Sequence, residues 1–145
     1  MVIKLFEESY RDDLIDMVML TKAALGRNPS INPDLLDIHG QYFARGDFFW
    51  IAVDEADRVI GCVGYSRCAD QTEAFLHRFF VKPCCQRQGI GAQLLQIAED
   101  TMRNQGISTS LVHLGEPEEE WAASYAFYPK HGYVLYAPGY MRKTL

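Results

Sequence analysis

The sequence lacks the features of several classes of protein. No apolar run approaches the length of a membrane-spanning helix, and the first residues, M-V-I-K-L-F-E-E, turn acidic too soon for a secretory signal. There is no internal repeat and no low-complexity stretch. The 145 residues, 48% hydrophobic and 23% charged, are enough to bury one core. We therefore expect a cytoplasmic protein with no membrane partner and a single domain over residues 1–145.

Basic clusters are scarce as well. The formal net charge is −5, and Arg142 and Lys143 form the one pair of neighbouring cations. A nucleic-acid-binding face needs a concentrated patch of Lys and Arg, so we expect no nucleic-acid partner. The negative charge is compatible with a cationic substrate such as an amine.

Metal-ligand patterns are also missing. The four cysteines contain no C-x-x-C, and the four histidines are scattered without the spacing of a zinc site. We interpret the adjacent Cys84 and Cys85 as two small residues in a tight loop of a reduced protein rather than as a redox pair. We therefore expect no metal ion and no disulfide.

The apolar pattern predicts alternating strands and helices. Ser9 and Asn32 are the expected N-caps of the first two helices. Helices are expected at about 10–25, 33–45, 90–105 and 116–131, each closed by a glycine. Strands are expected at 2–6, 48–54, 58–67, 72–82, 109–114, 133–136 and 140–145. The element order is thus β-α-α-β-β-β-α-β-α-β-β.

Two glycines, Gly89 and Gly91, stand where a predicted strand turns into a predicted helix, in the stretch Q-R-Q-G-I-G-A. Glycine is unfavourable in both kinds of element, so the site needs a turn or a close approach that only glycine allows. The first N–H groups of a helix are unpaired and carry partial positive charge, and a loop without bulky side chains lets phosphate oxygens reach them. The stretch therefore predicts an anion site, and the alternative is a tight turn with no ligand.

The common nucleotide-binding loops do not fit this stretch. A P-loop requires Lys and then Ser or Thr after its last glycine, but Gly91 is followed by Ala92 and Gln93. A dinucleotide-binding loop requires a third glycine where this chain has Leu94.

Two longer stretches resemble one family. Residues 76–95, L-H-R-F-F-V-K-P-C-C-Q-R-Q-G-I-G-A-Q-L-L, are similar to the strand-loop-helix of the GNAT family of N-acetyltransferases, with its pattern V-x-P and then Q/R-x-x-G-x-G/A. Residues 124–133, S-Y-A-F-Y-P-K-H-G-Y, resemble that family's late helix, F/L-Y-x-K-x-G-F/Y. The positions matched in the first pattern are Val81, Pro83, Gln86, Gly89 and Gly91. The resemblance implies a mixed α/β fold of the α+β type, with a central, mostly antiparallel sheet whose strands splay apart.

The resemblance also implies acetyl-CoA as co-substrate. In this family the glycine loop wraps the pyrophosphate, and the preceding strand pairs with the pantetheine arm. The N–H of Val81 is implied to polarise the acetyl carbonyl. The apolar residues of that strand break strict alternation, which fits the bulge that it carries in the family, although burial on both faces explains the pattern as well. The implied cofactor-binding residues are Phe79, Phe80, Val81, Gln86, Arg87, Gln88, Gly89, Ile90, Gly91 and Ala92.

Tyr128 stands at the position of the family's tyrosine. A phenol near the sulfur can protonate or hydrogen-bond the leaving thiolate, and its ordinary pKa near 10 keeps it protonated. Core packing is the alternative, because Trp121, Tyr125 and Tyr128 share a helical stripe. Trp121 stands where many family members have an Asn that makes a polar contact with pantetheine. Trp121 cannot make that polar contact, but it can cover the cofactor by packing. Pro129 disfavours helical geometry at Tyr128.

The acceptor amine must lose a proton. Glu73, at the start of the strand before the loop, lies where several family members keep a carboxylate base, and His77 and His113 are rivals. For Glu73, a solvated carboxylate at the strand edge is the alternative.

The resemblance thus implies an N-acetyltransferase that moves the acetyl group of acetyl-CoA to a primary amine of a small molecule or peptide by direct attack. Two alternatives stay open: the same chemistry with another acyl-CoA, and a non-catalytic acetyl-CoA-binding module. Homodimers are frequent among family members, so the resemblance is compatible with a homodimer.

Overall fold

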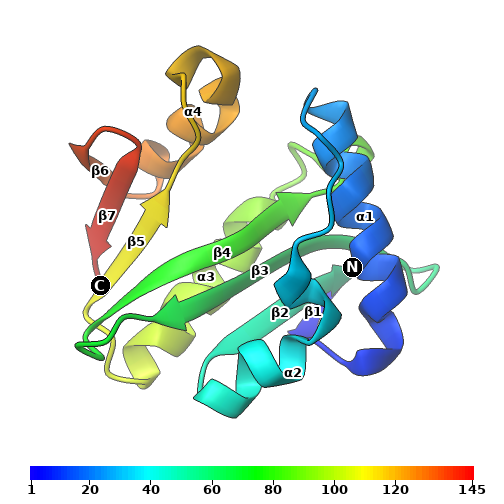
Figure 1. Ribbon diagram of the computed structural model, residues 1–145, viewed down its shortest axis with the longest axis horizontal. Coiled ribbons are helices and arrows are strands. Elements are labelled where there is room, and N and C mark those ends of the chain that lie inside the picture. The colour runs from blue at the N-terminus through cyan, green and yellow to red at the C-terminus, as the bar shows by residue number, and fades with distance from the viewer. The chain divides into compact units, whose positions relative to one another are not determined.

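The computed structural model describes residues 1–145, and its strands and α-helices follow the order expected from the sequence (Figure 1). The strands are β1 (Val2–Leu5), β2 (Phe48–Val53), β3 (Val59–Arg67), β4 (Glu73–Val81), β5 (Thr109–His113), β6 (Val134–Ala137) and β7 (Tyr140–Thr144). The α-helices are α1 (Arg11–Ala24), α2 (Ile38–Gln41), α3 (Ile90–Asn104) and α4 (Ala122–Lys130). Short 3-10 helices lie between them: η1 (Glu8–Tyr10), η2 (Pro33–Leu36), η3 (Phe43–Arg45), η4 (Pro83–Cys85) and η5 (Glu118–Trp121).

The strands form one sheet in the order β1-β2-β3-β4-β5-β7-β6. The pairs β1–β2, β2–β3, β5–β7 and β6–β7 are antiparallel, and β4–β5 is parallel. This confirms the predicted fold class. None of the helices combines the length and apolar character that a membrane crossing requires. The chain divides into two compact units: unit 1 comprises Met1–Tyr65 and Arg78–Ala98, and unit 2 comprises Ser66–His77 and Glu99–Leu145.

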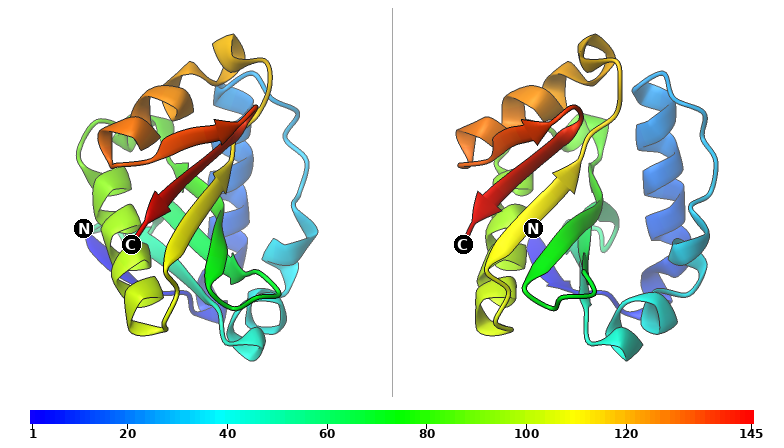
Figure 2. Two further views of the ribbon diagram at one scale, coloured as in Figure 1. Left: turned by 90° about the vertical axis from the view of Figure 1, so that its left-hand side faces the viewer. Right: turned by 60° about the vertical axis from the view of Figure 1, so that its left-hand side comes forward.

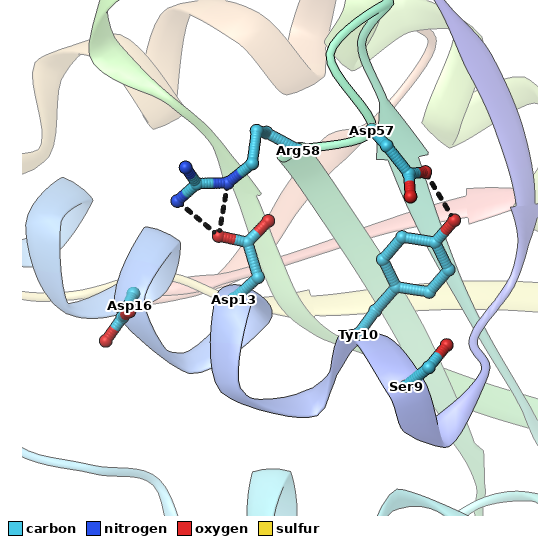
Figure 3. Close-up of a pocket in the computed structure, with 6 residues that line it drawn as sticks. All are labelled: Ser9, Tyr10, Asp13, Asp16, Asp57 and Arg58. Carbon is cyan, nitrogen blue, oxygen red and sulfur yellow. Dashed lines mark hydrogen bonds and ion pairs between the residues drawn. The ribbon is translucent and has the colours of Figure 1, made fainter.

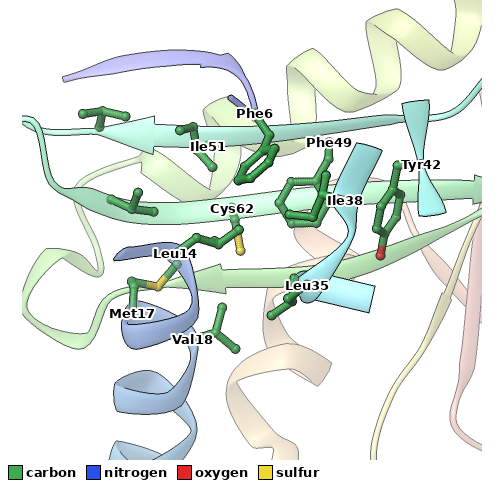
Figure 4. Close-up of a cluster of buried hydrophobic side chains, with 12 residues drawn as sticks. Phe6, Leu14, Met17, Val18, Leu35, Ile38, Tyr42, Phe49, Ile51 and Cys62 are labelled. Carbon is green, nitrogen blue, oxygen red and sulfur yellow. The ribbon is translucent and has the colours of Figure 1, made fainter. Parts of the chain in front are cut away.

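Unit 1 is built on β2 and β3, whose residues are buried almost without interruption. Strands buried on both faces read as continuous apolar runs, as F-F-W-I-A-V does here. One face packs against α1 and the short helices between residues 33 and 45 (Figure 4). Phe49 lies inside this cluster, edge-on to Phe6 at 6.1 Å and to Tyr42 at 5.0 Å between ring centroids. The cluster contains Phe6, Leu14, Met17, Val18, Leu35, Ile38, Tyr42, Phe49, Ile51, Val53, Val59 and Cys62.

Two glycines of β3 let neighbouring groups approach closely. A Cβ at Gly64 would lie 2.5 Å from Cδ2 of Phe49. A Cβ at Gly61 would lie 3.1 Å from Cδ1 of Leu94 on α3 and 3.2 Å from the carbonyl oxygen of Phe80 on β4. Because Gly61 has no side chain, the first half of α3 and the end of β4 both lie against the middle of β3. This contact fixes the two elements that flank the glycine loop.

The expected helix over 33–45 is wrong, because the chain forms three short pieces there, η2, α2 and η3. The backbone leaves helical geometry at Asp37, with φ −146° and ψ 65°, and again at Tyr42, with φ −123° and ψ −70°. Asp37 begins α2 as its N-cap, and its carboxylate accepts a hydrogen bond from the Gly40 N–H at 3.1 Å.

The expected N-cap at Ser9 is also wrong, whereas Asn32 does occupy the N-cap position before Pro33 but makes no side-chain cap bond. Ser9 lies inside η1, and neither η2 nor α1 has a side-chain cap. The amide oxygen of Asn32 instead accepts from Lys22 Nζ at 2.6 Å, and the Ser30 carbonyl accepts from the same nitrogen at 2.9 Å. Lys22 is 9% exposed, so its ammonium group requires these oxygens in place of water.

Arg78, in the middle of β4, has a left-handed backbone with φ +53°. Its guanidinium group binds the Asp34 carboxylate, with Nη2 at 2.9 Å from Oδ1 and Nε at 3.1 Å from both oxygens. Tyr42 Oη donates to Asp34 Oδ2 at 2.5 Å, and Cys62 Sγ donates to the Arg78 carbonyl at 3.0 Å. A left-handed residue with a side chain costs about 1–2 kcal/mol, which these bonds offset. Arg78 interrupts the regular pleat of β4 where the apolar alternation breaks.

Unit 2 is built on β5 and β7, which pair over the whole length of β5. β6 pairs with β7 as the edge strand, with an irregularity between Leu135 and Ala137 (Figure 2). On its other side, β5 pairs with three residues of β4, Glu73–Phe75. Pairing stops there although β5 continues to His113 and β4 to Val81. The expected splaying of strands stays a prediction.

We expect Asp34→Asn to lower the free energy of unfolding by about 1–3 kcal/mol at neutral pH, because it removes the charged partner of Arg78. Burial acts to raise the pKa of Asp34, but the hydrogen bonds from Arg78 and Tyr42 outweigh it and lower the pKa below the ordinary 3.8. The stabilisation is therefore present above the ordinary value and is lost as pH falls through the lowered one. Urea unfolding of both proteins at neutral and acidic pH measures the difference, which should shrink in acid.

The matched control is Asp12→Asn. Asp12 is an exposed carboxylate whose side chain is 87% accessible and which accepts from Arg11 at 3.2 Å. We expect this change to stay within about 0.5 kcal/mol of wild type. Equal losses in the two variants would show that the Asp34 ion pair contributes nothing specific.

Candidate active site

The glycine loop reverses the chain between β4 and α3. Arg87 and Gly89 both adopt left-handed backbone conformations, with φ +63° and +80°. A Cβ at Gly89 would meet no atom closer than 3.9 Å, so glycine is needed there for its backbone conformation rather than for space. Gly91 lies in the first turn of α3 and is not left-handed. Gly89 is thus the residue that permits the unusual turn.

A side-chain hydrogen bond closes the loop, and the first N–H groups of α3 are left without partners inside the helix. Gln86 Nε2 donates to the Val81 carbonyl at 3.1 Å. The Gly89 carbonyl accepts the first helical hydrogen bond, from the Gln93 N–H at 3.1 Å. The N–H groups of residues 90–92 precede this bond, so they have no partner within the helix. Because α3 is 15 residues long, its N-terminus also carries partial positive charge.

The end of β4 leads into this loop. Phe79, Phe80 and Val81 are each half-buried, and Phe80 packs against the core cluster of unit 1. The Lys82 N–H donates to the Ile60 carbonyl at 2.8 Å, which holds the strand end against β3. Unit 1 therefore contains the predicted cofactor-binding residues of both the strand and the loop.

Tyr128 lies in unit 2, in the second half of α4, and is 8% exposed. Its ring is edge-on to the rings of Phe127 and Tyr133, each at 5.3 Å between centroids. Burial raises the pKa of Tyr128, so the phenol keeps its proton at and well above neutral pH. The side chain therefore both packs in the core of unit 2 and carries a proton donor.

The expectation that Pro129 disturbs helical geometry at Tyr128 is wrong, because α4 continues through Pro129 to Lys130. The end of the helix is held by hydrogen bonds to the Tyr128 carbonyl, from the N–H of His131 at 2.9 Å and of Tyr133 at 3.1 Å. The Gly132 N–H also donates to the Pro129 carbonyl at 3.2 Å. These bonds keep Tyr128 helical in spite of the following proline.

Trp121 packs on the backbone just after β5. A Cβ at Gly115 would overlap its indole ring, so the ring lies flat against that residue. Tyr125 Oη donates to the Gly115 carbonyl at 3.2 Å. The two side chains thus join the end of β5 to the start of α4. This contact gives Trp121 a packing role, and its contact with the cofactor stays a prediction.

The three candidate bases lie on β4 and β5. Glu73 is half-buried and pairs with Thr109, where the parallel pairing begins. His77 lies on β4 beyond the last paired residue, and His113 ends β5, where it stacks on Tyr140 at 4.3 Å with 5° between the ring planes. His113 lies four positions after Thr109 on the strand, which is about 13 Å. Glu73 and His113 are therefore separate candidates rather than a pair acting on one proton.

Two further charged residues were not singled out from the sequence. Arg78 is a cation in the middle of β4, and Glu99 is 2% exposed on α3. Glu99 follows Leu95 by four residues and precedes Met102 by three, so it occupies a position of the apolar stripe. A charge at such a position was the available signal, because a buried charge must have a partner.

A polar pocket of about 390 Å³ lies in unit 1 between the start of α1 and the turn that joins β2 to β3 (Figure 3). Arg58 donates to one oxygen of Asp13 from Nε at 2.9 Å and from Nη2 at 2.7 Å, and Tyr10 Oη donates to Asp57 at 2.6 Å. The hydrogen bond from Arg58 is the main reason that the pKa of Asp13 is lowered. These side chains hydrogen-bond to one another and hold the turn between β2 and β3 against the start of α1. Because their polar groups are used for this contact, we do not regard the pocket as a candidate active site.

A second pocket, of about 530 Å³, lies in unit 2 beside the turn between β6 and β7. It is acidic and aromatic, with no Lys or Arg in its lining. Burial, with the charges of Glu118 and Glu116, raises the pKa of Tyr125 in its wall. The lining residues are Glu116, Pro117, Glu118, Tyr125, Leu135, Tyr136, Ala137, Pro138 and Gly139. Such a lining favours a cation over an anion.

Comparison with known families decides the kind of protein. The model of the acetyltransferase (GNAT) family matches residues 9–133. The chain belongs to the GNAT family. The resemblance of the two sequence stretches is thereby confirmed. In this GNAT chain the predicted cofactor residues 79–81 and 86–92 belong to unit 1, whereas Glu73, Trp121 and Tyr128 belong to unit 2.

Solved structures share the GNAT fold. An acetyltransferase of the GNAT family from Staphylococcus aureus Mu50 is 21% identical, with 99% of this chain and 98% of that chain covered and a TM-score of 0.88. An aminoglycoside 6'-N-acetyltransferase complexed with coenzyme A is 20% identical, with 99% and 97% covered and a TM-score of 0.76. Among sequence relatives, Probable N-acetyltransferase 14 of Xenopus tropicalis is 31% identical over 98 residues, or 68% of this chain. The chain spans about half, 48%, of that relative's length.

We expect Gly89→Ala to lower the free energy of unfolding by about 1–2 kcal/mol, because alanine is strained at φ +80°. Gly89→Asn should cost less, since asparagine tolerates the left-handed region better than alanine does. Urea unfolding compares the three proteins. An alanine variant as stable as wild type would show that the loop does not need this conformation.

Proposed function

We propose that this chain is a single-domain N-acetyltransferase, spanning residues 1–145, that moves the acetyl group of acetyl-CoA to a primary amine of a small molecule or peptide. The observation that carries the proposal is the loop between β4 and α3. Its exposed left-handed residues, Arg87 and Gly89, lead into a helix whose first N–H groups lack partners within the helix. This chemistry suits a pyrophosphate. Within the same fold, the aminoglycoside 6'-N-acetyltransferase is complexed with coenzyme A.

In the proposed complex, backbone N–H groups of residues 87–92 donate to the pyrophosphate oxygens. Each charge-assisted hydrogen bond of this kind contributes about 1.5–3 kcal/mol. The exposed guanidinium group of Arg87 adds a cation, and Gln86 keeps the loop closed through its bond to the Val81 carbonyl. The small residues at 89, 91 and 92 leave the backbone accessible.

The pantetheine arm pairs with the end of β4 as an added strand, along Phe79, Phe80 and Val81. The Val81 N–H then donates to the acetyl carbonyl oxygen, on which negative charge develops when the amine attacks. Trp121 covers the arm by packing.

In the proposed reaction the ammonium group first gives one proton to solvent, the neutral amine nitrogen attacks the acetyl carbon, and the tetrahedral intermediate collapses as the bond from carbon to sulfur breaks. The sulfur takes a proton from Tyr128, which is protonated in the free protein because burial raises its pKa. Glu73 receives the proton that the amine loses, directly or through water, and solvent restores the proton of Tyr128. No covalent enzyme intermediate forms, and positioning supplies most of the acceleration.

The acceptor is proposed to be an amine that is cationic in solution. The net charge of −5 and the acidic, aromatic lining of the pocket beside the β6–β7 turn both support this class. An amine next to an apolar group would also contact Tyr125 and Leu135 of that lining. A screen should therefore include tryptamine and phenethylamine beside spermidine and a lysine peptide.

Calorimetric titration with acetyl-CoA, CoA and 3′-dephospho-CoA tests the binding site. We expect wild type to bind acetyl-CoA and Gly91→Glu to weaken binding by at least about a hundredfold, because its carboxylate would oppose the pyrophosphate where backbone N–H groups should meet it. Gln105→Glu adds the same charge at the exposed far end of α3 and should bind as wild type does. Folded wild type that fails to bind any of the three would remove the basis of the transferase proposal.

Release of the CoA thiol, measured with the amine panel, tests the role of Tyr128. We expect Tyr128→Phe to lower kcat by about a hundredfold and to leave KM for acetyl-CoA within about twofold, since the hydroxyl acts on the leaving group. Tyr10→Phe removes an exposed hydroxyl that bonds Asp57 in unit 1, outside the proposed site, and should keep kcat within about twofold. A Tyr128→Phe enzyme with unchanged kcat would restrict Tyr128 to packing.

A further inference from the structure

Unit 2 contains a buried charged network that the proposed reaction does not use. Glu99 on α3 is 2% exposed, and both of its carboxylate oxygens are bonded. Oε2 accepts from Tyr133 Oη at 2.8 Å, and Oε1 accepts from Lys143 Nζ at 2.8 Å. A carboxylate buried without such partners would be strongly destabilising. The network therefore holds Tyr133 and Lys143 to one point on α3.

The protons in this network have a fixed direction. The phenol of Tyr133 has one proton, which it donates to Glu99, so it can only accept from Ser110 Oγ at 2.8 Å. Ser110 is fully buried on β5. Burial raises the pKa of Tyr133, and the charge of Glu99 raises it further against the opposing hydrogen bond from Ser110. The protonated phenol thus links α3 to β5 through its two hydrogen bonds.

The same tyrosine contacts Tyr128 in two ways. Gly132, with φ +92°, turns the chain back after α4, so that the Tyr133 N–H donates to the Tyr128 carbonyl at 3.1 Å. The two rings lie 5.3 Å apart between centroids, with 67° between their planes. The hydroxyl of Tyr133 is therefore fixed by Glu99 and Ser110, while its ring and backbone support Tyr128.

We propose that Tyr133, held by Glu99 and Ser110, is a positioning residue that fixes the ring of Tyr128 for proton donation to the leaving thiolate. This inference rests on the proposed function, because it assigns Tyr133 a role through Tyr128. Loss of the Tyr133 hydroxyl releases one end of the supporting ring without removing its packing surface. A displacement of about 1 Å at a reacting group can cost up to about a hundredfold in rate.

A double-mutant cycle on kcat, measured by thiol release with the most active amine of the panel, tests the inference. Tyr133→Phe should lower kcat by about tenfold or more and keep KM for acetyl-CoA within about twofold. In the Tyr128→Phe background the same change should have no further effect, because the hydroxyl that it positions is absent. Tyr10→Phe, which removes an exposed hydrogen bond of 2.6 Å to Asp57 in unit 1, is the matched control and should leave kcat unchanged in both backgrounds.

The outcomes separate the two proposals. If Tyr133→Phe lowers kcat by the same factor in both backgrounds, Tyr133 acts on the protein as a whole and this inference fails, while the role of Tyr128 stands. If Tyr128→Phe alone has no effect, both fail. Should Tyr133→Phe not fold, Ser110→Ala enters the same cycle, because it removes the hydrogen bond from Ser110 to the Tyr133 hydroxyl and leaves the ion pair of Glu99 intact.

A second readout needs no acceptor. In protein labelled with 13C-tyrosine, the ring signal of Tyr128 is identified by its loss in Tyr128→Phe. We expect Tyr133→Phe to broaden or split that signal, because the ring gains alternative positions. Tyr10→Phe should leave it unchanged. A Tyr128 signal as sharp and unshifted in Tyr133→Phe as in wild type would overturn the inference.

Discussion

The ion pair between Arg78 and Asp34 is the contact on which the course of β4 depends. It holds a left-handed residue in the middle of a strand, with the Cys62 thiol bonded to the carbonyl of that residue. It also dictates the shape of the segment that supplies Asp34. Tyr42 must reach the same carboxylate, and eight residues of regular helix would separate the two by about 12 Å. The break at Asp37 brings them together, so the irregular segment at 33–45 is the consequence of a bond to β4.

A carboxylate held between a cation and a phenol recurs in unit 2. Asp34 accepts from Arg78 and Tyr42, and Glu99 accepts from Lys143 and Tyr133. In each case the buried charge is tolerated because both carboxylate oxygens accept hydrogen bonds. Removing one partner lowers the free energy of unfolding strongly, because it leaves a buried charge unpaired, whereas the complete network stabilises the fold little more than apolar side chains would. Such networks accept few alternative packings. One fixes a backbone conformation, and the other fixes an aromatic ring.

Local signals predicted much of the fold. Apolar runs, closing glycines and the two motifs predicted the strands, the long helices α1 and α3 and a glycine-dependent turn before α3, because each depends on neighbouring residues. The errors depend on hydrogen bonds that the apolar pattern and the motifs do not reveal. The side chain of Asn32 bonds Lys22 instead of a helical N–H, and the effect of Pro129 is overridden by hydrogen bonds from the turn that follows. The broken alternation of β4 indicates an irregularity but does not reveal the ion pair of Arg78 with Asp34 or its left-handed backbone. Of the candidate site, the motif positions could be read from the sequence, but the network behind Tyr128 could not, since its members are scattered from 99 to 143.

The packing of Trp121 on Gly115 has an optical consequence. The chain has two tryptophans, and they fall one in each unit. Trp50 is 3% exposed in unit 1, stacked on Phe48 at 5.9 Å, and Trp121 reports on the junction between β5 and α4 in unit 2. Replacing either one with phenylalanine leaves the emission of the other as a probe of its own unit. The protein therefore carries a built-in pair of fluorophores that can tell whether its two units melt together or in turn.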